Sequence, residues 1–343
     1  TDGLHEWFYA CGVPVAVKAV RRRNQSMRPQ GRDSFAGEGF MKMRALLVGL
    51  VAVGLSATAI AADPIVIKFS HVVAQDTPKG KAAEKFKALA EQYTNGAVKV
   101  EVYANSTLYK DKEEMEALQL GAVQLLAPSL AKFGPLGVRE FEVFDLPYIF
   151  DGYDALNKIT QGAVGQQLLA KLEPKGIRGL AFWDNGFKSF SANSPIKKPE
   201  DLRGKKMRIQ SSKVLEEQMR EVKSLPQVMA FSEVYQALQT GVVDGTENPH
   251  SNLYTQKMHE VQKHMTLTDH GYLGYAVITN KKFWDGLPAE VRTQLDKALA
   301  ESTAYANQIA KEENDKSLEA VRASGKTEIY TPTAEEKAAF KKA

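Results

Sequence analysis

Residues 65–102 read IVIKFSHVVAQDTPKGKAAEKFKALAEQYTNGAVKVEV, and this stretch decides the fold class. The alternation in Ile65–Phe69 predicts a mostly buried strand. Apolar side chains then recur at helical spacing, at Ala82, Phe86, Leu89 and Tyr93. A stop signal follows at Asn95-Gly96, and Val98–Val102 alternates again. The stretch therefore predicts a strand, a helix and a second strand.

The same alternation of strand and helix patterns continues beyond this unit. A helix is predicted around Asp111–Leu120. Later apolar runs, with helical segments between them, predict further strands at Val123–Ala127, Ile177–Trp183, Met207–Gln210 and Gln227–Phe231. This order is typical of α/β domains built on largely parallel sheets.

A long amphipathic helix is predicted over Pro288–Ala323. Its apolar positions lie roughly on one face, and no Gly or Pro interrupts it before Gly325. The chain has 343 residues, which is enough for two domains. In a two-domain protein, a helix of this length can run from one lobe to the other.

The overall charge of the chain argues against a nucleic-acid partner. The formal net charge is +4, but residues 1–62 hold eight of the 45 Lys and Arg residues and four of the 41 Asp and Glu residues. From Asp63 onward 37 residues of each sign remain, so the body of the protein is neutral. Phosphate binding requires an excess of basic side chains, which is missing here.

Residues 41–61 predict a cleaved secretory signal peptide, and hence a periplasmic protein. A short positive start precedes an uncharged run, Ala45–Ile60, and small residues follow at the cleavage position. The run is shorter than the roughly 20 apolar residues that a membrane-spanning helix requires. Residues 1–40 lie upstream, and we interpret them as a misassigned start ahead of Met41 or Met43.

Motifs for catalysis or metal binding are missing from the sequence. There is no phosphate-binding loop, dinucleotide fingerprint or Gly-x-Ser-x-Gly elbow. The single cysteine, Cys11, precedes the predicted cleavage site, and no His-Glu-x-x-His pair occurs. We therefore predict no cofactor, no metal and no enzyme activity. The alternative is an enzyme site assembled from residues distant in the sequence, such as one acting on a carboxylate.

Several segments between Phe69 and Asn280 resemble TRAP transporter solute-binding proteins of the DctP family, most closely the four-carbon dicarboxylate-binding branch. The resemblance begins at Ser70–Val73 and Thr77–Lys81 and continues through Phe144–Tyr148 and Asn185–Phe187. The most specific blocks are PEDLRGKKMR, residues 199–208, and YQALQTGVVDGTEN, residues 235–248. They stand in the expected order and cover essentially the whole mature chain.

The resemblance implies an α/β fold of two lobes around a central cleft, with crossing strands at the hinge and a long helix spanning both lobes. We expect lobe I to comprise residues 62–185 plus 274–314, and lobe II residues 186–273 plus 315–343. The implied partners are a small organic acid and the small and large membrane subunits of a TRAP transporter, and we expect a monomer. The sequence departs from the family in ending at Ala343, and at Lys188 and Thr246, where Arg and Gln are common.

Arg208 is the leading candidate for binding an acid. It stands at the carboxyl end of a predicted strand, and a guanidinium can hold a carboxylate through two parallel hydrogen bonds. Lys188 is expected to add a second positive charge, as a point charge instead of a fork. Asn248 can donate and accept hydrogen bonds. The alternatives are solvated charges for Arg208 and Lys188, and a turn residue before Pro249 for Asn248.

Further candidates adjoin these positions, each with a structural alternative. His71 and Ser129 follow predicted strands and can hydrogen-bond the far end of a ligand, or stabilise their strands. The others are aromatic or lie near the expected hinge and either line the cleft or pack in the core: Trp183, Phe187, His270 and Tyr272.

The sequence therefore predicts a binding subunit that captures succinate, malate or fumarate and delivers it to a membrane permease. The same role with a sugar acid, keto acid or aromatic acid is the nearest alternative, because sequence does not give pocket volume. A sensor subunit that signals to a receptor is another.

Overall fold

The computed structural model describes residues 63–343; the predicted signal peptide, the upstream segment and Cys11 lie outside them. The described strands form one mixed sheet in the order β2-β1-β3-β8-β4-β7-β5-β6, and β9 pairs with β8. The strands are β1 (Ile65–Ser70), β2 (Val98–Tyr103), β3 (Leu125–Leu126), β4 (Ile177–Ala192), β5 (Lys206–Ile209), β6 (Leu225–Val228), β7 (Gly245–Asn248), β8 (His264–Asn280) and β9 (Glu328–Tyr330).

The helices pack around this sheet. The α-helices are α1 (Pro78–Tyr93), α2 (Glu114–Gln119), α3 (Tyr153–Thr160), α4 (Ala163–Ala170), α5 (Lys213–Glu221), α6 (Val234–Gln239), α7 (His250–Thr255), α8 (Lys281–Asp285), α9 (Ala289–Ser324) and α10 (Ala334–Lys342). Short 3-10 helices are η1 (Leu130–Lys132), η2 (Arg139–Asp145), η3 (Glu173–Lys175), η4 (Pro199–Leu202), η5 (Phe231–Glu233) and η6 (Met258–Glu260).

The strand–helix–strand prediction for residues 65–102 is confirmed. β1 and β2 pair in parallel along their whole length, with α1 between them in the chain. α1 begins at Pro78, and the Thr77 hydroxyl accepts a hydrogen bond from the Gly80 N–H at 3.1 Å. Proline suits this position because the first N–H groups of a helix have no partner within it.

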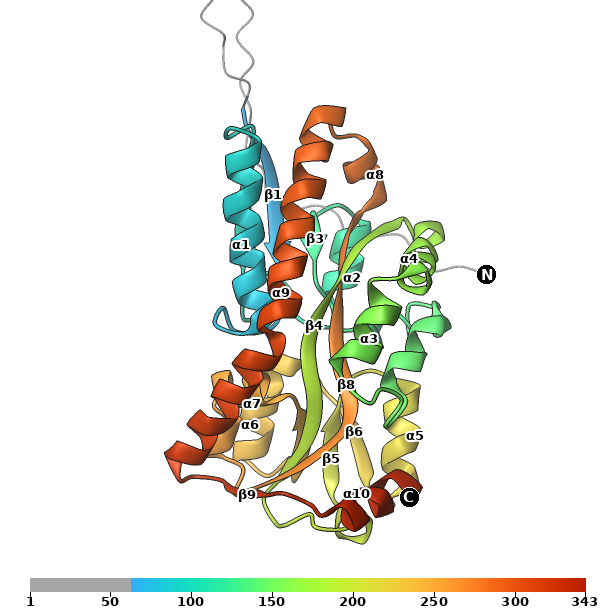
Figure 1. Cartoon of the computed structure of the whole chain (residues 1–343), viewed down its shortest axis with the longest axis vertical. Helices are drawn as coiled ribbons and strands as arrows, with labels where there is room; N and C mark the ends of the chain where they lie inside the picture. Colours follow the sequence, from blue (N-terminus) through green and yellow to red (C-terminus); the bar gives the residue numbers. More distant parts are fainter. Residues whose placement is uncertain (1–62) are drawn as a thin grey trace, which may run out of the picture. The chain divides into compact units, whose positions relative to one another are not determined.

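Two long strands, β4 and β8, join the two halves of the sheet (Figure 1). They pair antiparallel from Ile177 opposite Asn280 to Ala192 opposite His264, with three register shifts. β1–β2, β1–β3, β5–β6 and β5–β7 are parallel, whereas β3–β8 and β4–β7 are antiparallel. The expectation of largely parallel sheets therefore holds within each half but not where β4 and β8 cross.

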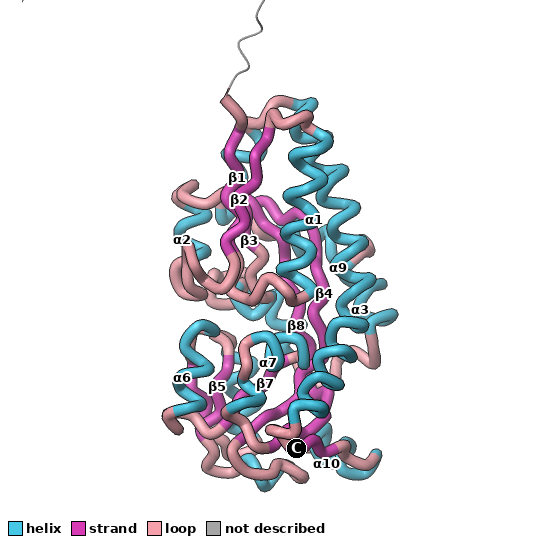
Figure 2. Tube along the Cα trace, turned by 90° about the vertical axis from the view of Figure 1, so that its left-hand side faces the viewer, coloured by secondary structure: helices cyan, strands magenta, loops and turns pink. Residues whose placement is uncertain are grey.

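The long helix predicted over Pro288–Ala323 is confirmed as α9. It has 36 residues and extends about 54 Å at 1.5 Å per residue. Leu295 and Leu299 pack with residues of α1, and Val321, near the other end, packs in a cluster with Leu253 of α7. Figure 2 shows α9 running beside α1 and on past α7.

The apolar cores lie in two groups. Two clusters surround β1, β2, β3 and the first part of β4, and two others surround β5, β7 and their helices. Two pairs of buried residues pack across the predicted lobe boundaries: Val72 and Val73 with Phe231, and Tyr272 and Leu273 in the clusters around β1 to β4. The boundaries themselves stay a prediction.

Three strands differ from the predicted extents by more than one residue. The run Ile177–Trp183 continues as β4 to Ala192. The run Val123–Ala127 forms only the two-residue β3, and the Ala127 carbonyl accepts a hydrogen bond from a lysine side chain instead of a neighbouring strand. The run Gln227–Phe231 is replaced by β6, which ends at Val228. Phe231 instead begins η5, and its N–H donates to the Asp111 carboxylate.

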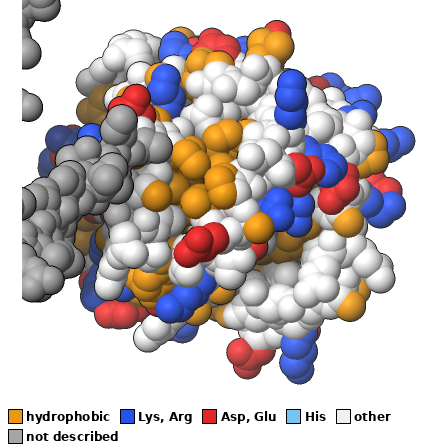
Figure 3. All heavy atoms as spheres, turned by 90° about the horizontal axis from the view of Figure 1, so that it is seen from above, with side chains coloured by type: hydrophobic (Ala, Val, Ile, Leu, Met, Phe, Trp, Pro, Cys, Tyr) orange, Lys and Arg blue, Asp and Glu red, His pale blue; other side chains and the backbone are white. Residues whose placement is uncertain are grey.

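The surface agrees with the neutral composition. Seen from above, side chains of both charge signs are interspersed around an apolar patch (Figure 3). Within residues 63–343, no helix has the length and apolar character needed to cross a bilayer.

Candidate functional site

Arg208 lies on β5 with its guanidinium buried. The side chain is 3% exposed, and its Nε and Nη2 donate to the Met229 carbonyl at 3.1 and 2.8 Å. No described carboxylate forms an ion pair with it within 4 Å, although the charge of Asp111 acts on it. A guanidinium has five N–H donors, so part of its fork remains available to an anion.

A cavity of about 280 Å³ adjoins Arg208. Its wall includes Asp111, Lys132 and Gln210. Lys132 Nζ lies 2.7 Å from Asp111, and the same carboxylate accepts the Phe231 N–H at 2.5 Å. Burial acts to raise the pKa of Asp111, but Lys132, Arg208 and this hydrogen bond hold it below its usual value. Asp111 is therefore ionised beside Arg208, and neither it nor Lys132 was among the predicted site residues.

Lys188 and His270 meet at one carboxylate, that of Glu247. Lys188 Nζ lies 2.6 Å from Glu247 Oε1, and His270 Nε2 lies 2.7 Å from Oε2. Thr268 holds the other ring nitrogen of His270 at 2.7 Å, and Phe190 stacks on the ring at 3.9 Å between centroids. Burial raises the pKa of Glu247, but Lys188 and His270 outweigh it and lower that pKa to about 2. The charge of Lys188 is thus balanced inside the protein.

Asn248 ends β7, where it pairs with Ser189 of β4. Its side chain is buried, and Nδ2 lies 3.2 Å from the Thr246 hydroxyl. β5 pairs with β7 through Arg208 opposite Thr246. The two most specific sequence blocks therefore meet at this point of the sheet.

His71 and Ser129 follow β1 and β3, as the sequence predicts. His71 is fully buried, and neither ring nitrogen has a hydrogen-bond partner among the described residues. Burial, and then the charge of Lys79, lower its pKa to about 3, so the ring is neutral. The Ser129 hydroxyl accepts from the Ala131 N–H at 3.3 Å and begins η1, which carries Lys132.

The predicted aromatic residues lie in the core. Trp183 is fully buried, and its indole N–H donates to Thr303 of α9 at 2.9 Å. Phe187 packs on Tyr272, whose hydroxyl donates to Asp184 at 2.7 Å. None of the three lines the cavity beside Arg208.

Comparison with known proteins identifies the family of this chain. Residues 69–343 match the family described as bacterial extracellular solute-binding protein, family 7, or DctP. The chain belongs to this family. A Rhodobacter capsulatus relative, the C4-dicarboxylate-binding periplasmic protein DctP, is 72% identical over 86% of this chain and 89% of its own.

Two crystal structures of TRAP periplasmic solute-binding proteins are similar in fold. One, from Shewanella oneidensis with bound succinate, is 44% identical, with a TM-score of 0.80 over 81% of this chain and 91% of that one. The other, from Pseudomonas aeruginosa with bound L-malate, is 44% identical, with a TM-score of 0.79 over 81% and 97%. The two-lobe α/β fold expected from the sequence is thereby confirmed, and this chain is a solute-binding protein.

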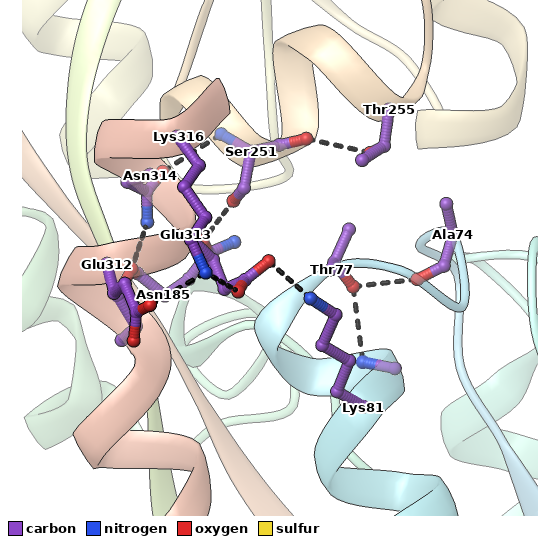
Figure 4. Close-up of polar contacts among 12 residues, drawn as sticks. Ala74, Thr77, Lys81, Asn185, Ser251, Thr255, Glu312, Glu313, Asn314 and Lys316 are labelled. Carbon is purple, nitrogen blue, oxygen red and sulfur yellow. Dashed lines mark hydrogen bonds and ion pairs between the residues drawn. The ribbon is translucent and has the colours of Figure 1, made fainter. Parts of the chain in front are cut away.

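A polar network ties the crossing strands of this family member to α9 (Figure 4). Asn314 Nδ2 donates to the Asn185 carbonyl at 2.8 Å, and Asn314 Oδ1 accepts the Ser251 N–H at 2.9 Å. The Ser251 hydroxyl donates to Asn185 Oδ1 at 2.9 Å. Asn185 lies on β4 and Ser251 on α7, so the network fixes β4, α7 and α9 together.

Sequence reasoning missed Lys79, Asp111 and Lys132. Lys79 belongs to a block that matches the family, but a lysine in the first turn of a helix gives no signal of burial. Asp111 and Lys132 stand in loops and at a helix end, where charged residues are usually solvated. In the described part of the chain, no group of three or more His, Cys, Asp or Glu side chains is placed to hold a metal.

Proposed function

We propose that this protein captures a four-carbon dicarboxylate in the periplasm and that Arg208 is its main anchor. One observation carries the proposal: a buried guanidinium, held only by a carbonyl, stands at the wall of a small cavity. A carboxylate satisfies the paired N–H groups of a guanidinium better than water does. The names of the relatives, which refer to C4-dicarboxylates, succinate and L-malate, support an acid of this size.

The other predicted residues are proposed to act in three ways: by direct contact with the ligand, through a second residue, or by packing. Asn248 is proposed to contact the ligand directly, since it lies on β7 two residues beyond Thr246, the partner of Arg208 in the sheet. Lys188 acts through Glu247, because that carboxylate already accepts its hydrogen bond. His270 also acts through Glu247, and Ser129 positions Lys132. Trp183, Phe187 and Tyr272 keep the crossing strands packed.

The wider role follows from the family. We propose that the signal peptide is cleaved, that the chain folds as a monomer with the two predicted lobes, and that it delivers the acid unchanged to the membrane subunits of a TRAP transporter. No turnover is expected, because binding and release alone serve this role.

The test is the affinity of residues 62–343 for succinate, measured by isothermal titration calorimetry on two variants. Arg208→Gln should weaken binding by about 30-fold or more, because an interaction between a fork and a carboxylate contributes about 2–5 kcal/mol and each ~1.4 kcal/mol is a factor of ten. Arg203→Gln is the matched control, since Arg203 is exposed in the same sequence block. Its affinity should stay at the wild-type value. An unchanged affinity in Arg208→Gln contradicts the proposal.

A sugar acid, keto acid or aromatic acid is the rival ligand. If one of these binds and the dicarboxylates do not, the cavity accepts a different acid and the proposed cargo is wrong.

A further inference from the structure

Lys79 is a buried lysine whose hydrogen bonds are mostly unmade. It lies in the first turn of α1 and is 1% exposed. Its Nζ donates to the Ala127 carbonyl at 2.9 Å and stands 3.7 Å from the centroid of the Tyr275 ring. An ammonium has three donors, and within residues 63–343 no carboxylate pairs with this one inside 4 Å. A buried charge is rarely left in this condition, because its desolvation is costly.

Neighbouring polar groups are also without partners. Both ring nitrogens of His71 and the hydroxyl of Ser70 are buried and accept or donate no hydrogen bond in the described structure. His71 is close enough to Lys79 for the lysine charge to lower its pKa. A buried polar group without a partner costs free energy. Several such groups at the end of β1 and the start of α1 indicate a place that a polar ligand fills.

The charges around this place have a positive surplus. Lys79, Lys132 and Arg208 face the carboxyls of Asp111 and Glu114. Asp111 is ionised, whereas burial and Asp111 raise the pKa of Glu114 against the pull of Lys132 and Lys79. Burial in turn lowers the pKa of Lys79 to about 7, although both carboxyls act to raise it. Three basic side chains therefore face two acidic ones, and a carboxylate that arrives beside Lys79 favours its charged form.

The surroundings of Lys79 and the cavity beside Arg208 share one neighbour, Asp111. Lys132 lies 2.7 Å from Asp111 and 3.9 Å from Glu114, and the charges of these two carboxylates also act on Lys79. Lys132 and Asp111 both line the cavity. Lys79 and Arg208, which both lie under the influence of Asp111, suit a ligand that carries a carboxylate at each end.

We propose that Lys79, with the neutral ring of His71 beside it, holds the second carboxylate of the ligand and so selects dicarboxylates over monoacids. This inference rests on the proposed function, in which Arg208 holds the first carboxylate. It assigns specificity to the start of α1, and not to the balanced Lys188–Glu247 pair.

The experiment compares succinate with succinamate, in which an amide replaces one carboxylate, by titration calorimetry. The wild-type protein should prefer succinate by more than about 100-fold. Lys79→Met keeps the length of the side chain without its charge, and should reduce that preference to less than about fivefold by weakening succinate binding alone. Lys81→Met is the control, since Lys81 lies on the same helix and pairs with Glu313 nearer the surface (Figure 4).

The outcomes separate the two proposals. If the wild-type protein binds no dicarboxylate, the proposed function itself fails. If it binds succinate and Lys79→Met keeps the wild-type preference, only the role of Lys79 is overturned.

A second measurement needs no variant and covers the case in which Lys79→Met does not fold. Burial lowers the pKa of Lys79, and an arriving carboxylate raises it again, as it does that of Glu114. Succinate binding above pH 7 should therefore take up a fraction of a proton, seen as a dependence of the binding heat on the ionisation enthalpy of the buffer. Absence of any proton uptake contradicts the proposal.

Discussion

At the scale of residues, the buried charges fall into two kinds. Lys188, Glu247 and His270 satisfy one another at 2.6 and 2.7 Å. Arg208 and Lys79 are equally buried, but they bond only to carbonyl oxygens. The first group is balanced within the protein, and for the second we propose a ligand as the missing partner. The two kinds of buried charge differ in their hydrogen-bond partners and not in their burial.

The balanced group leads to a prediction on stability. Glu247→Gln should lower the free energy of unfolding at pH 7 by about 3–5 kcal/mol, because it leaves the buried Lys188 ammonium without its counterion. The measurement is urea denaturation followed by circular dichroism. Glu260→Gln is the control, since Glu260 pairs with Lys326 at 2.9 Å on the surface and its loss should change stability little.

The Lys188–Glu247 ion pair also sets the direction in which stability changes with pH. The folded pKa of Glu247, about 2, lies below its usual value of 4.5, so its stabilisation is present above pH 4.5 and is lost as the pH falls toward 2. The difference between wild type and Glu247→Gln should therefore shrink over that interval. A difference that stays constant from pH 6 to pH 2 contradicts the ion pair.

At the scale of elements, the crossing strands and α9 hold the site in place. Asn314 of α9 contacts two other elements, because it donates to the Asn185 carbonyl on β4 and accepts the Ser251 N–H of α7. Gly186 lies against the same side chain, where an added Cβ would stand 2.8 Å from Asn314 Nδ2. The close approach of β4 to α9 at this point therefore depends on a residue without a side chain.

Asn314→Leu should destabilise the protein by about 2–4 kcal/mol, since it leaves buried backbone groups on two other elements unpaired. Urea denaturation measures the loss. Lys311→Leu, at an exposed position of the same helix, should change stability by less than about 1 kcal/mol. Equal effects of the two substitutions would show that the network contributes nothing specific.

The elements themselves could largely be predicted from the sequence. The period of apolar residues located β1, α1, β2 and α9 because each of these buries one face or stripe. The full lengths of β4 and β8 could not be predicted. Both cross from one half of the sheet to the other, so their buried faces change and the simple alternation is lost. The antiparallel pairing of these strands follows from that crossing.

The site could be predicted only in part. Arg208 and Asn248 could be named as candidates because they stand in blocks that resemble the family, and their binding role stays a prediction. Asp111, Lys132 and Lys79 were missed because burial of a lysine or aspartate depends on contacts between distant segments, such as Asp111 with Phe231. The expected second cation, Lys188, is balanced by Glu247, which no local pattern shows.

At the scale of the whole molecule, the fold places the candidate site where the two proposed lobes meet. Asp111, assigned to lobe I, accepts the Phe231 N–H from lobe II, and Asp145 of lobe I likewise accepts a hydrogen bond from the Ser212 hydroxyl of lobe II at 2.7 Å. Asp111 lines the cavity beside Arg208. A ligand can favour this closed arrangement only if it binds the closed form more tightly than the open one. Carboxylate contacts with both lobes supply that difference.

The most direct test of the account is the ligand preference of the wild-type protein, residues 62–343, measured by titration calorimetry with one acid of each class. Succinate, L-malate and fumarate should bind with dissociation constants in the micromolar range or below, which corresponds to about −8 kcal/mol or more favourable. Galactonate, pyruvate and benzoate should bind at least about 100-fold more weakly. Tight binding of any of these three, with no measurable heat from the dicarboxylates, would contradict the central claim.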